Sequence, residues 1–207
     1  YFDADGTPLG DDMSLGTETA LHSLPSIAWL EGGRAAVVWS DFTLDSSNSE
    51  VRVRLFGDDG AAWGPDVQVN ASTTVYEDDA RVVGLVGGGF VVVWTADDGQ
   101  GGGGDIYAQM FNSFGDPTGP QLTIESDLGD QDQPEVAPLA DGGFAIVWRD
   151  ASGLSSGDGD LGAIRLRRFD STGYSYGPDE FVNTTTVGEQ SRPSVARLAD
   201  GGFVVTW

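Results

Sequence analysis

Acidic side chains gather in the loops that follow three of the Trp residues, and this pattern could bind calcium. Calcium takes roughly six to eight oxygen ligands, which carboxylates and the backbone carbonyls of flexible loops supply. No EF-hand pattern is present. The alternative is that these are solvated residues that keep edge strands from aggregating. The candidate metal ligands are Asp41, Asp45 and Glu50 in the first loop, Asp97, Asp98 and Asp105 in the second, and Asp150, Asp158 and Asp160 in the third.

A second acidic group recurs at another point of the chain, just ahead of a predicted strand. Its members are Glu77, Asp78 and Asp79, then Asp130 and Asp132, then Glu189. Asp and Glu at such positions are typical of turns and strand starts. We therefore interpret this group as structural rather than as a set of ligands.

Side chains suited to catalysis are few. The sequence has one histidine, His22, and no cysteine, and no Ser/His/Asp set recurs. A carboxylate pair for glycoside hydrolysis depends on spatial separation, which the sequence does not give. Because a catalytic pair is normally unique and these acids follow the repeat, we expect no enzyme activity.

Two aromatic residues and the arginines are candidates for binding a ligand. Trp29 and Trp63 depart from the repeat described below and could line a glycan site, although a variation in packing is the simpler explanation. Arginines alternate with apolar residues in two segments and could pair with carboxylates across strands or hold an anionic sugar or a partner protein. These arginines are Arg52, Arg54, Arg165, Arg167 and Arg168.

The elements that position these residues repeat along the chain. "LADGGFAIVW" at 139–148 returns as "LADGGFVVTW" at 198–207, with weaker copies at 85–94 and 30–39. The closing tryptophans Trp39, Trp94, Trp148 and Trp207 are 55, 54 and 59 residues apart. A phenylalanine before a glycine turn keeps the same period, at Phe2, Phe56, Phe111 and Phe169. Two markers with one period indicate an internal repeat.

Each repeat contains the signals of four strands. In the unit that starts at Phe111, strands are predicted at 120–125, 134–140, 144–148 and 163–169. The Asp-Gly-Gly between the second and third is a hairpin turn. The third strands, "FVVVW" and "FAIVW", are apolar throughout and should be covered on both faces. The fourth strands alternate Arg with apolar residues, which predicts one face in water.

An inner strand packed between neighbours and an outer strand wet on one side are typical of a β-propeller blade. We predict an all-β, β-propeller-like array of four-stranded antiparallel blades, with about 55 residues per repeat. The tryptophans would close the contact between blades. The domain is 1–207, with units starting near 2, 56, 111 and 169 and the last one incomplete. An open β-solenoid and a sandwich remain alternatives.

Composition restricts the partners. The chain has 33 acidic residues and 10 basic ones, all arginine, for a net charge of -23. This charge repels nucleic acid and anionic membranes. No apolar run is long enough to insert in a membrane. The chain begins at Tyr1, without Met, and ends on a strand-like Trp207, so we expect an excerpt of a longer polypeptide.

The segments "PEVAPLADGGFAIVW", "DIYAQMF" and 179–207 resemble repeats of large secreted bacterial proteins of the haemolysin-type calcium-binding (RTX) and adhesin kind. The resemblance covers nearly the whole chain but is poor in the first unit, and the RTX calcium nonapeptide is missing. It implies secretion to the bacterial cell surface, bound Ca²⁺ and no catalysis.

These observations lead to one expected function and two alternatives. We expect a non-catalytic extracellular structural or adhesive module, stabilised by Ca²⁺, whose partners are a cell-surface glycan or protein, or neighbouring repeats of the same polypeptide. The first alternative is a glycan-binding, lectin-like propeller. The second is a fragment of a polysaccharide-degrading enzyme.

Overall fold

The computed structural model describes residues 2–16, 20–43, 48–71, 75–97, 103–126, 129–152 and 162–207. Within these residues the strands form three four-stranded antiparallel sheets and one two-stranded sheet. The first sheet holds β1 (Ala20–Leu30), β2 (Arg34–Thr43), β3 (Ser49–Gly57) and β4 (Ala62–Gln68). The second holds β5 (Tyr76–Gly84), β6 (Phe90–Asp97), β7 (Gly104–Phe111) and β8 (Leu122–Glu125). The third holds β9 (Gln131–Pro138), β10 (Phe144–Asp150), β11 (Ala163–Phe169) and β12 (Glu180–Phe181), and the fourth β13 (Ser194–Arg197) and β14 (Phe203–Thr206).

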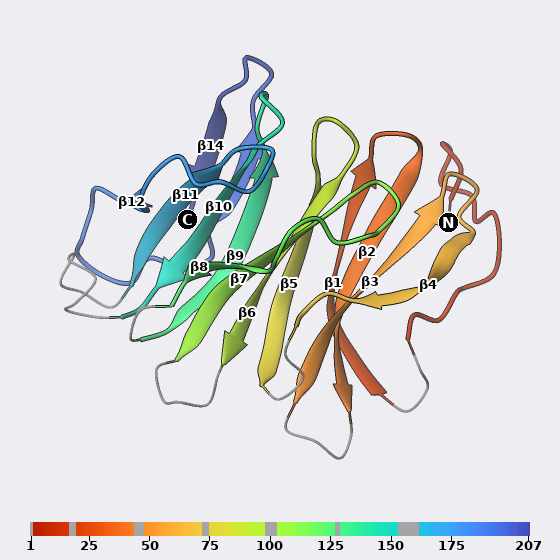
Figure 1. The fold of residues 1–207 in the computed structure, drawn as a ribbon, viewed down its shortest axis with the longest axis horizontal. Coiled ribbons are helices and arrows are strands. Elements are labelled where there is room, and N and C mark those ends of the chain that lie inside the picture. The colour runs from red at the N-terminus through yellow and green to blue at the C-terminus, as the bar shows by residue number, and fades with distance from the viewer. Residues whose placement is uncertain are drawn as a thin grey trace.

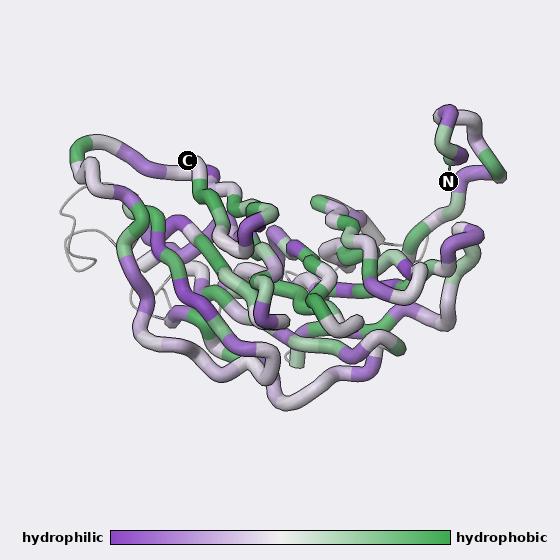
Figure 2. Tube along the Cα trace, turned by 90° about the horizontal axis from the view of Figure 1, so that it is seen from above, coloured by the Kyte–Doolittle hydropathy of each residue, from purple (hydrophilic) through white to green (hydrophobic). Residues whose placement is uncertain are grey.

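The sheets stand side by side in chain order, with the two chain ends at opposite sides of the row (Figure 1). Seen from above, the row curves into an arc (Figure 2). The first strand of each sheet contacts the first strand of the next, so β1, β5, β9 and β13 form the inner edge of the arc. The predicted four-stranded antiparallel blades are confirmed, and we call the sheets blades 1 to 4.

The apolar core consists of layers between successive blades. Between blades 1 and 2 it includes Val38, Val53, Val82 and Trp94, all buried. A second layer lies between blades 2 and 3, and a third between blades 3 and 4. Burial of apolar surface at about 25 cal/mol per Å² is therefore gained chiefly by stacking one blade on the next.

Both sequence markers of the repeat lie in these layers. Trp39, Trp94 and Trp148 are almost completely buried, as predicted for residues that close the contact between blades. The Phe marker stacks on the first residue of the second strand of its blade. In blade 2 the ring centroids of Phe111 and Phe90, the first residue of β6, are 4.8 Å apart. The repeat therefore encodes the contact between blades.

The repeated unit and the blade are offset by one strand. The strand that follows each Phe marker pairs with the strand before that marker: β8 pairs with β7, with Tyr107 opposite Thr123. In blade 1, β4 pairs with β3 in the same way. Each blade therefore takes its outermost strand from the start of the next sequence unit.

The predicted wet face of the arginine strands differs in the structure. Arg54, Arg165 and Arg167 are only 16–19% exposed, because their guanidinium groups are held in ion pairs between strands. Arg167 of β11 reaches Glu125 of β8, in the preceding blade, at 3.2 Å. Arg167 on β11 thus links two blades. The predicted pairing of these arginines with carboxylates on other strands is confirmed.

Candidate functional site

Each inner strand begins with an irregularity at the same repeat position. Leu24, Asp79, Gln133 and Arg192 have φ between 49° and 56°, the left-handed region that non-glycine residues rarely adopt. The pairing register shifts between Ser23 and Ser26 in β1 and between Asp78 and Arg81 in β5. Such bulges redirect side chains and often lie next to functional sites.

At these bulges, charged side chains form a network along the inner edge, which we call the axial cluster. It contains Asp79, Arg81, Asp132, Glu135, Arg149 and Glu189. Arg81 of β5 lies 2.7 Å from Asp79 on its own strand and donates through Nε to Glu135 of β9 at 2.9 Å. One guanidinium therefore links carboxylates of adjacent blades.

The pattern repeats one blade further along. Arg149 of β10 donates to Asp132 of β9 at 3.0 Å and lies 3.2 Å from Glu189, which precedes β13. The side chains of Asp132 and Glu135 are 34% and 31% exposed, so solvent and a ligand can reach both. Two arginine-centred groups thus present carboxylates at the starts of neighbouring inner strands.

Burial raises the pKa of two acids in the cluster. Burial raises the pKa of Asp79 above its ordinary value, and the nearby Arg81 opposes that effect only in part. Burial likewise raises the pKa of Asp132, with Arg149 opposing. A carboxyl whose pKa is raised, close to a second carboxylate, is an arrangement that general acid catalysis uses.

A buried polar residue lies at the first or second position of the inner strands, next to the axial cluster. Glu77 in β5 is 2% exposed, and Gln131 in β9 is fully buried. Burial, and then the charge of Glu50, raise the pKa of Glu77 to about 8. Among the described residues, neither amide atom of Gln131 has a hydrogen-bond partner. Glu77 is too deeply buried to touch a polymeric ligand. Its protonation therefore bears on the contact between blades 1 and 2 rather than on a ligand.

The structure places two of the predicted calcium ligands, Asp41 and Glu50, opposite each other on β2 and β3, where both carboxylates contact Arg52. Asp41 lies near His22 and Arg52, Asp105 accepts a hydrogen bond from Tyr107, and Asp150 pairs with Arg165. Glu50 pairs with Arg52, and Asp97 ends β6. Asp45, Asp98, Asp158 and Asp160 lie outside the described residues. No three acidic or histidine side chains among the described residues form a set that could hold a metal ion. Calcium binding stays a prediction.

The two candidate tryptophans are also apart. Trp29 is 64% exposed on β1, where it pairs with Ala35. Trp63 is 50% exposed on β4 and carries the guanidinium of Arg34 at 4.1 Å from its ring centroid. Neither residue lies in the axial cluster.

Sequence reasoning found half of the axial cluster. Asp79, Asp132 and Glu189 belong to the second acidic group, which we interpreted as structural. Arg81, Glu135 and Arg149 were not singled out, because their importance depends on contacts between blades. The available signal was a charged residue two or three positions after the acidic group, at Arg81 and Glu135.

Comparisons with solved structures place this architecture among known folds. A protein of unknown function from Dyadobacter fermentans matches with a TM-score of 0.61 at 12% identity, covering 91% of this chain and 62% of that one. The α-L-arabinanase of Penicillium chrysogenum, complexed with arabinobiose, matches at 0.59 and 14%, covering 84% and 53%. The endo-arabinase of Bacteroides thetaiotaomicron matches at 0.55 and 16%, covering 87% and 68%. The fold is a β-propeller fold. No family model matches the sequence, and no curated protein matches it.

These matches correct three expectations. The resemblance to RTX repeats is wrong, because the neighbours of stated activity are glycoside hydrolases with this propeller fold. The expected non-catalytic structural or adhesive module, and the expectation that the chain is no enzyme, are overturned by the same neighbours. The two carbohydrate alternatives agree better with them. Secretion to the cell surface stays a prediction.

The described residues contain no helix with the length and apolar character needed to span a membrane.

Proposed function

We propose that this chain is part of a carbohydrate-active propeller that binds an arabinose-containing oligosaccharide across the axial cluster and hydrolyses a glycosidic bond there. The observation that carries the proposal is the Asp79–Arg81–Glu135 group. It combines a carboxyl of raised pKa with a second, accessible carboxylate on the adjacent inner strand, both bound to one guanidinium.

The proposed roles follow from glycoside chemistry. Hydrolysis needs one protonated carboxyl to give its proton to the leaving oxygen, and one ionised carboxylate on the other side of the scissile bond. Burial raises the pKa of Asp79 above its ordinary value, so we assign this residue as the acid. Glu135, bound to the same guanidinium from the adjacent inner strand, is assigned as the second carboxylate. Water adds its hydroxyl to the anomeric carbon, and its remaining proton restores the acid.

Arg81 positions the pair rather than reacting. Its three nitrogens contact Glu135, the carbonyl of Ala80 and Asp79, so its plane is fixed. A fixed guanidinium holds both carboxylates in place. If one carboxylate moves away, the freed N–H group can donate to a sugar hydroxyl. The neighbours support the choice of ligand, since two of them were solved with arabinobiose.

The test uses the 207-residue chain with arabinobiose for binding and linear arabinan for turnover. We expect product release, with Asp79→Asn and Glu135→Gln each lowering kcat by about 100-fold or more. Melting curves establish that the variants are folded. Asp11→Asn removes the same charge from the exposed segment 2–16 and should leave both readouts unchanged. Absence of any turnover, or an Asp79→Asn variant as active as the parent, refutes the proposal.

A further inference from the structure

The opposite end of the blades carries a second feature that repeats. Beyond the inner strands, the turns at 31–33, 86–89 and 140–143 face the turns that follow β3, β7 and β11. Between blades 2 and 3 these turns border an open pocket of about 740 Å³, and between blades 3 and 4 one of about 710 Å³. Ala140 and Asp141 line both pockets.

The two pockets are built from equivalent residues. Leu85, Met110 and Thr118 line the first, and Leu139, Arg168 and Tyr176 take the same positions of the repeat in the second. The backbone contacts confirm the equivalence, because Thr118 and Tyr176 donate to the carbonyls of Met110 and Arg168 respectively. The repeat therefore places a pocket at the same point of both blade contacts, with Met110 and Thr118 in the first where Arg168 and Tyr176 stand in the second.

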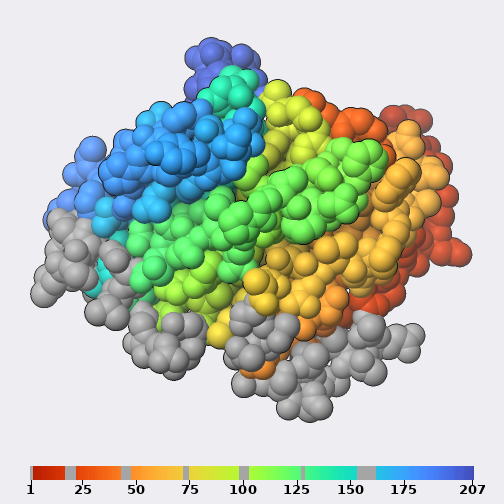
Figure 3. Space-filling model, viewed as in Figure 1, coloured from red at the N-terminus to blue at the C-terminus, as the bar shows by residue number. Residues whose placement is uncertain are grey.

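The corresponding space between blades 1 and 2 is filled by the protein's own side chains. Trp63 occupies the repeat position of Thr118, and Phe114 that of Thr172. The guanidinium of Arg34 lies 4.1 Å from the centroid of Trp63 and 5.2 Å from that of Phe114, and it donates to the carbonyl of Ser113 at 2.6 Å. Figure 3 shows this turn, in green, extending over the surface of blade 1. Trp63 and Phe114 are 50% and 63% exposed, so flat rings lie at the open side of this space.

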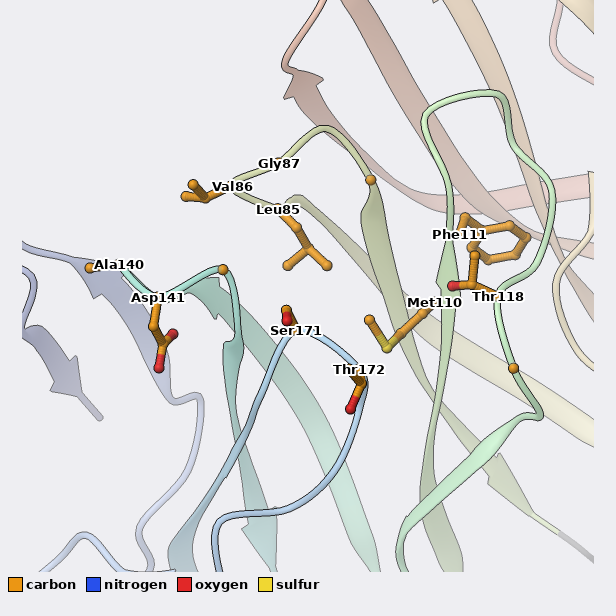
Figure 4. A pocket seen from close by; sticks show the side chains of 13 residues that line it. Leu85, Val86, Gly87, Met110, Phe111, Thr118, Ala140, Asp141, Ser171 and Thr172 are labelled. Atoms are coloured by element: carbon orange, nitrogen blue, oxygen red, sulfur yellow. The ribbon is translucent and has the colours of Figure 1, made fainter.

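The pocket between blades 2 and 3 has an apolar floor and a hydroxyl-bearing side. Leu85 and Met110 are buried and point toward the space bordered by Ser171 and Thr172 (Figure 4). The carboxylate of Asp141 is turned to the other pocket, where it accepts a hydrogen bond from Tyr176 at 2.8 Å. The lining toward Leu85 thus combines apolar contact with hydroxyl groups and carries no directed charge.

We propose that the pocket between blades 2 and 3 binds one ring of a neutral saccharide, with a counterpart between blades 3 and 4. A sugar ring has about the dimensions of the Phe114 ring, which lies at the equivalent position between blades 1 and 2. Its C–H face packs on Leu85 and Met110, and its hydroxyls hydrogen-bond to Ser171 and donate to the Thr172 hydroxyl, whose own proton goes to Asp170 at 2.7 Å. Few polar groups above an apolar base are the usual composition of a small-ligand pocket.

This site is separate from the axial cluster and does not depend on it. Leu85 directly follows the end of β5 and lies six positions after Asp79, which at about 3.3 Å per residue places them about 20 Å apart. The proposed hydrolysis and the proposed pocket can therefore fail independently.

The test is a titration followed through backbone amide signals by NMR. Arabinobiose, xylobiose and cellobiose are added up to about 10 mM, where a millimolar site is mostly occupied. The amides of Gly142, Ser171 and Thr172 report on the pocket, and those of Asp79 and Arg81 report on the axial cluster. We expect at least one disaccharide to shift the pocket amides.

A filling variant makes the assignment specific. Thr172→Phe places a ring where Phe114 lies in the preceding blade, and the turn tolerates it because both residues donate their N–H to an Asx side chain two positions earlier. We expect at least about tenfold weaker binding at the pocket. Asp5→Phe adds a ring at the same position of the turn in segment 2–16, where Asp5 donates to Asp3, and should leave the pocket shifts intact.

Each remaining result overturns the inference. Shifts confined to the axial amides would leave the proposed function standing and reject the pocket. No shift of the pocket amides with any of the three disaccharides, or a Thr172→Phe variant that binds like the parent, would also reject it.

Discussion

Glu77 shows how a single residue can make the stability of a blade contact depend on pH. Its carboxyl lies almost fully buried at the start of β5, and its main chain is fixed by Ser49 of β3, whose hydroxyl accepts from the Glu77 N–H at 2.6 Å. The equivalent residues of blade 3 and of the segment before β13 are Gln131 and Gln190, which carry no charge. Blade 2 therefore has a titratable side chain at the position where the other two units have a neutral amide.

Replacing Glu77 should remove this pH dependence. The folded chain keeps the Glu77 proton up to pH about 8, whereas the unfolded chain loses it near the ordinary value of 4.5. Folding takes up a proton between these values, so this residue's contribution to stability is present below pH 4.5 and is lost as pH rises toward 8. We expect Glu77→Gln to stabilise the chain at pH 8 by about 1–3 kcal/mol and to have little effect at pH 4. Denaturant unfolding at both pH values measures this, and an equal effect at both would contradict it.

The tryptophan marker offers a matched pair of positions with different burial. Trp94 is fully buried between blades 1 and 2, whereas Trp207, at the same repeat position, is 52% exposed. Trp94→Ala should cost about 3–5 kcal/mol of unfolding free energy, because it leaves a large cavity. Trp207→Ala should change that energy by less than about 0.5 kcal/mol. Equal losses in the two variants would show that the layers between blades are not the main source of stability.

At the scale of the element, the hairpin turns depend on a close backbone approach. A Cβ atom on Gly143 would lie 2.1 Å from the carbonyl oxygen of Phe169, whereas one on Gly177 would meet no atom within 4 Å. The Gly143 carbonyl also accepts the Leu139 N–H at 2.8 Å, so the backbone has little room to move. The second Gly of the Asp-Gly-Gly turn is thus required by the adjacent strand.

Alanine at these two glycines should therefore have opposite outcomes. Gly143→Ala forces β10 away from β11 and should destabilise the chain by about 1–3 kcal/mol. Gly177→Ala should be neutral within about 0.5 kcal/mol. Thermal melting of the two variants decides, and a Gly143→Ala variant as stable as the parent would disprove the steric argument.

The strands could be predicted from the sequence because their signals are local. "FAIVW" and "AIRLRRF" lie within β10 and β11, and the Asp-Gly-Gly between 140 and 144 is a turn. The partner of β8 could not be predicted, since a polar-alternating strand has the same pattern whichever neighbour it pairs with. The axial cluster was hidden for a related reason. Asp79 is visible as an acid, but its left-handed backbone and its link through Arg81 to Glu135 exist only once two blades stack.

At the scale of the whole molecule, the net charge of -23 opposes compaction, and bound cations would offset it. Millimolar calcium should therefore raise the melting temperature, reversibly on addition of EDTA, and by more than sodium chloride of equal ionic strength does. The sodium control matters because screening alone stabilises so acidic a chain. Identical melting curves in calcium and in matched sodium chloride would end the calcium prediction.

The one-strand offset between unit and blade has a consequence for synthesis. When the ribosome has finished the unit that ends at Leu55, blade 1 still lacks β4, which belongs to the following unit. Its edge is sealed only when the next stretch of chain emerges, and the same holds for blade 2 and β8. Blades 1 to 3 each receive their outermost strand from the following unit. Duplication of one whole unit therefore inserts a new blade and leaves no sheet in the interior of the array without its outermost strand.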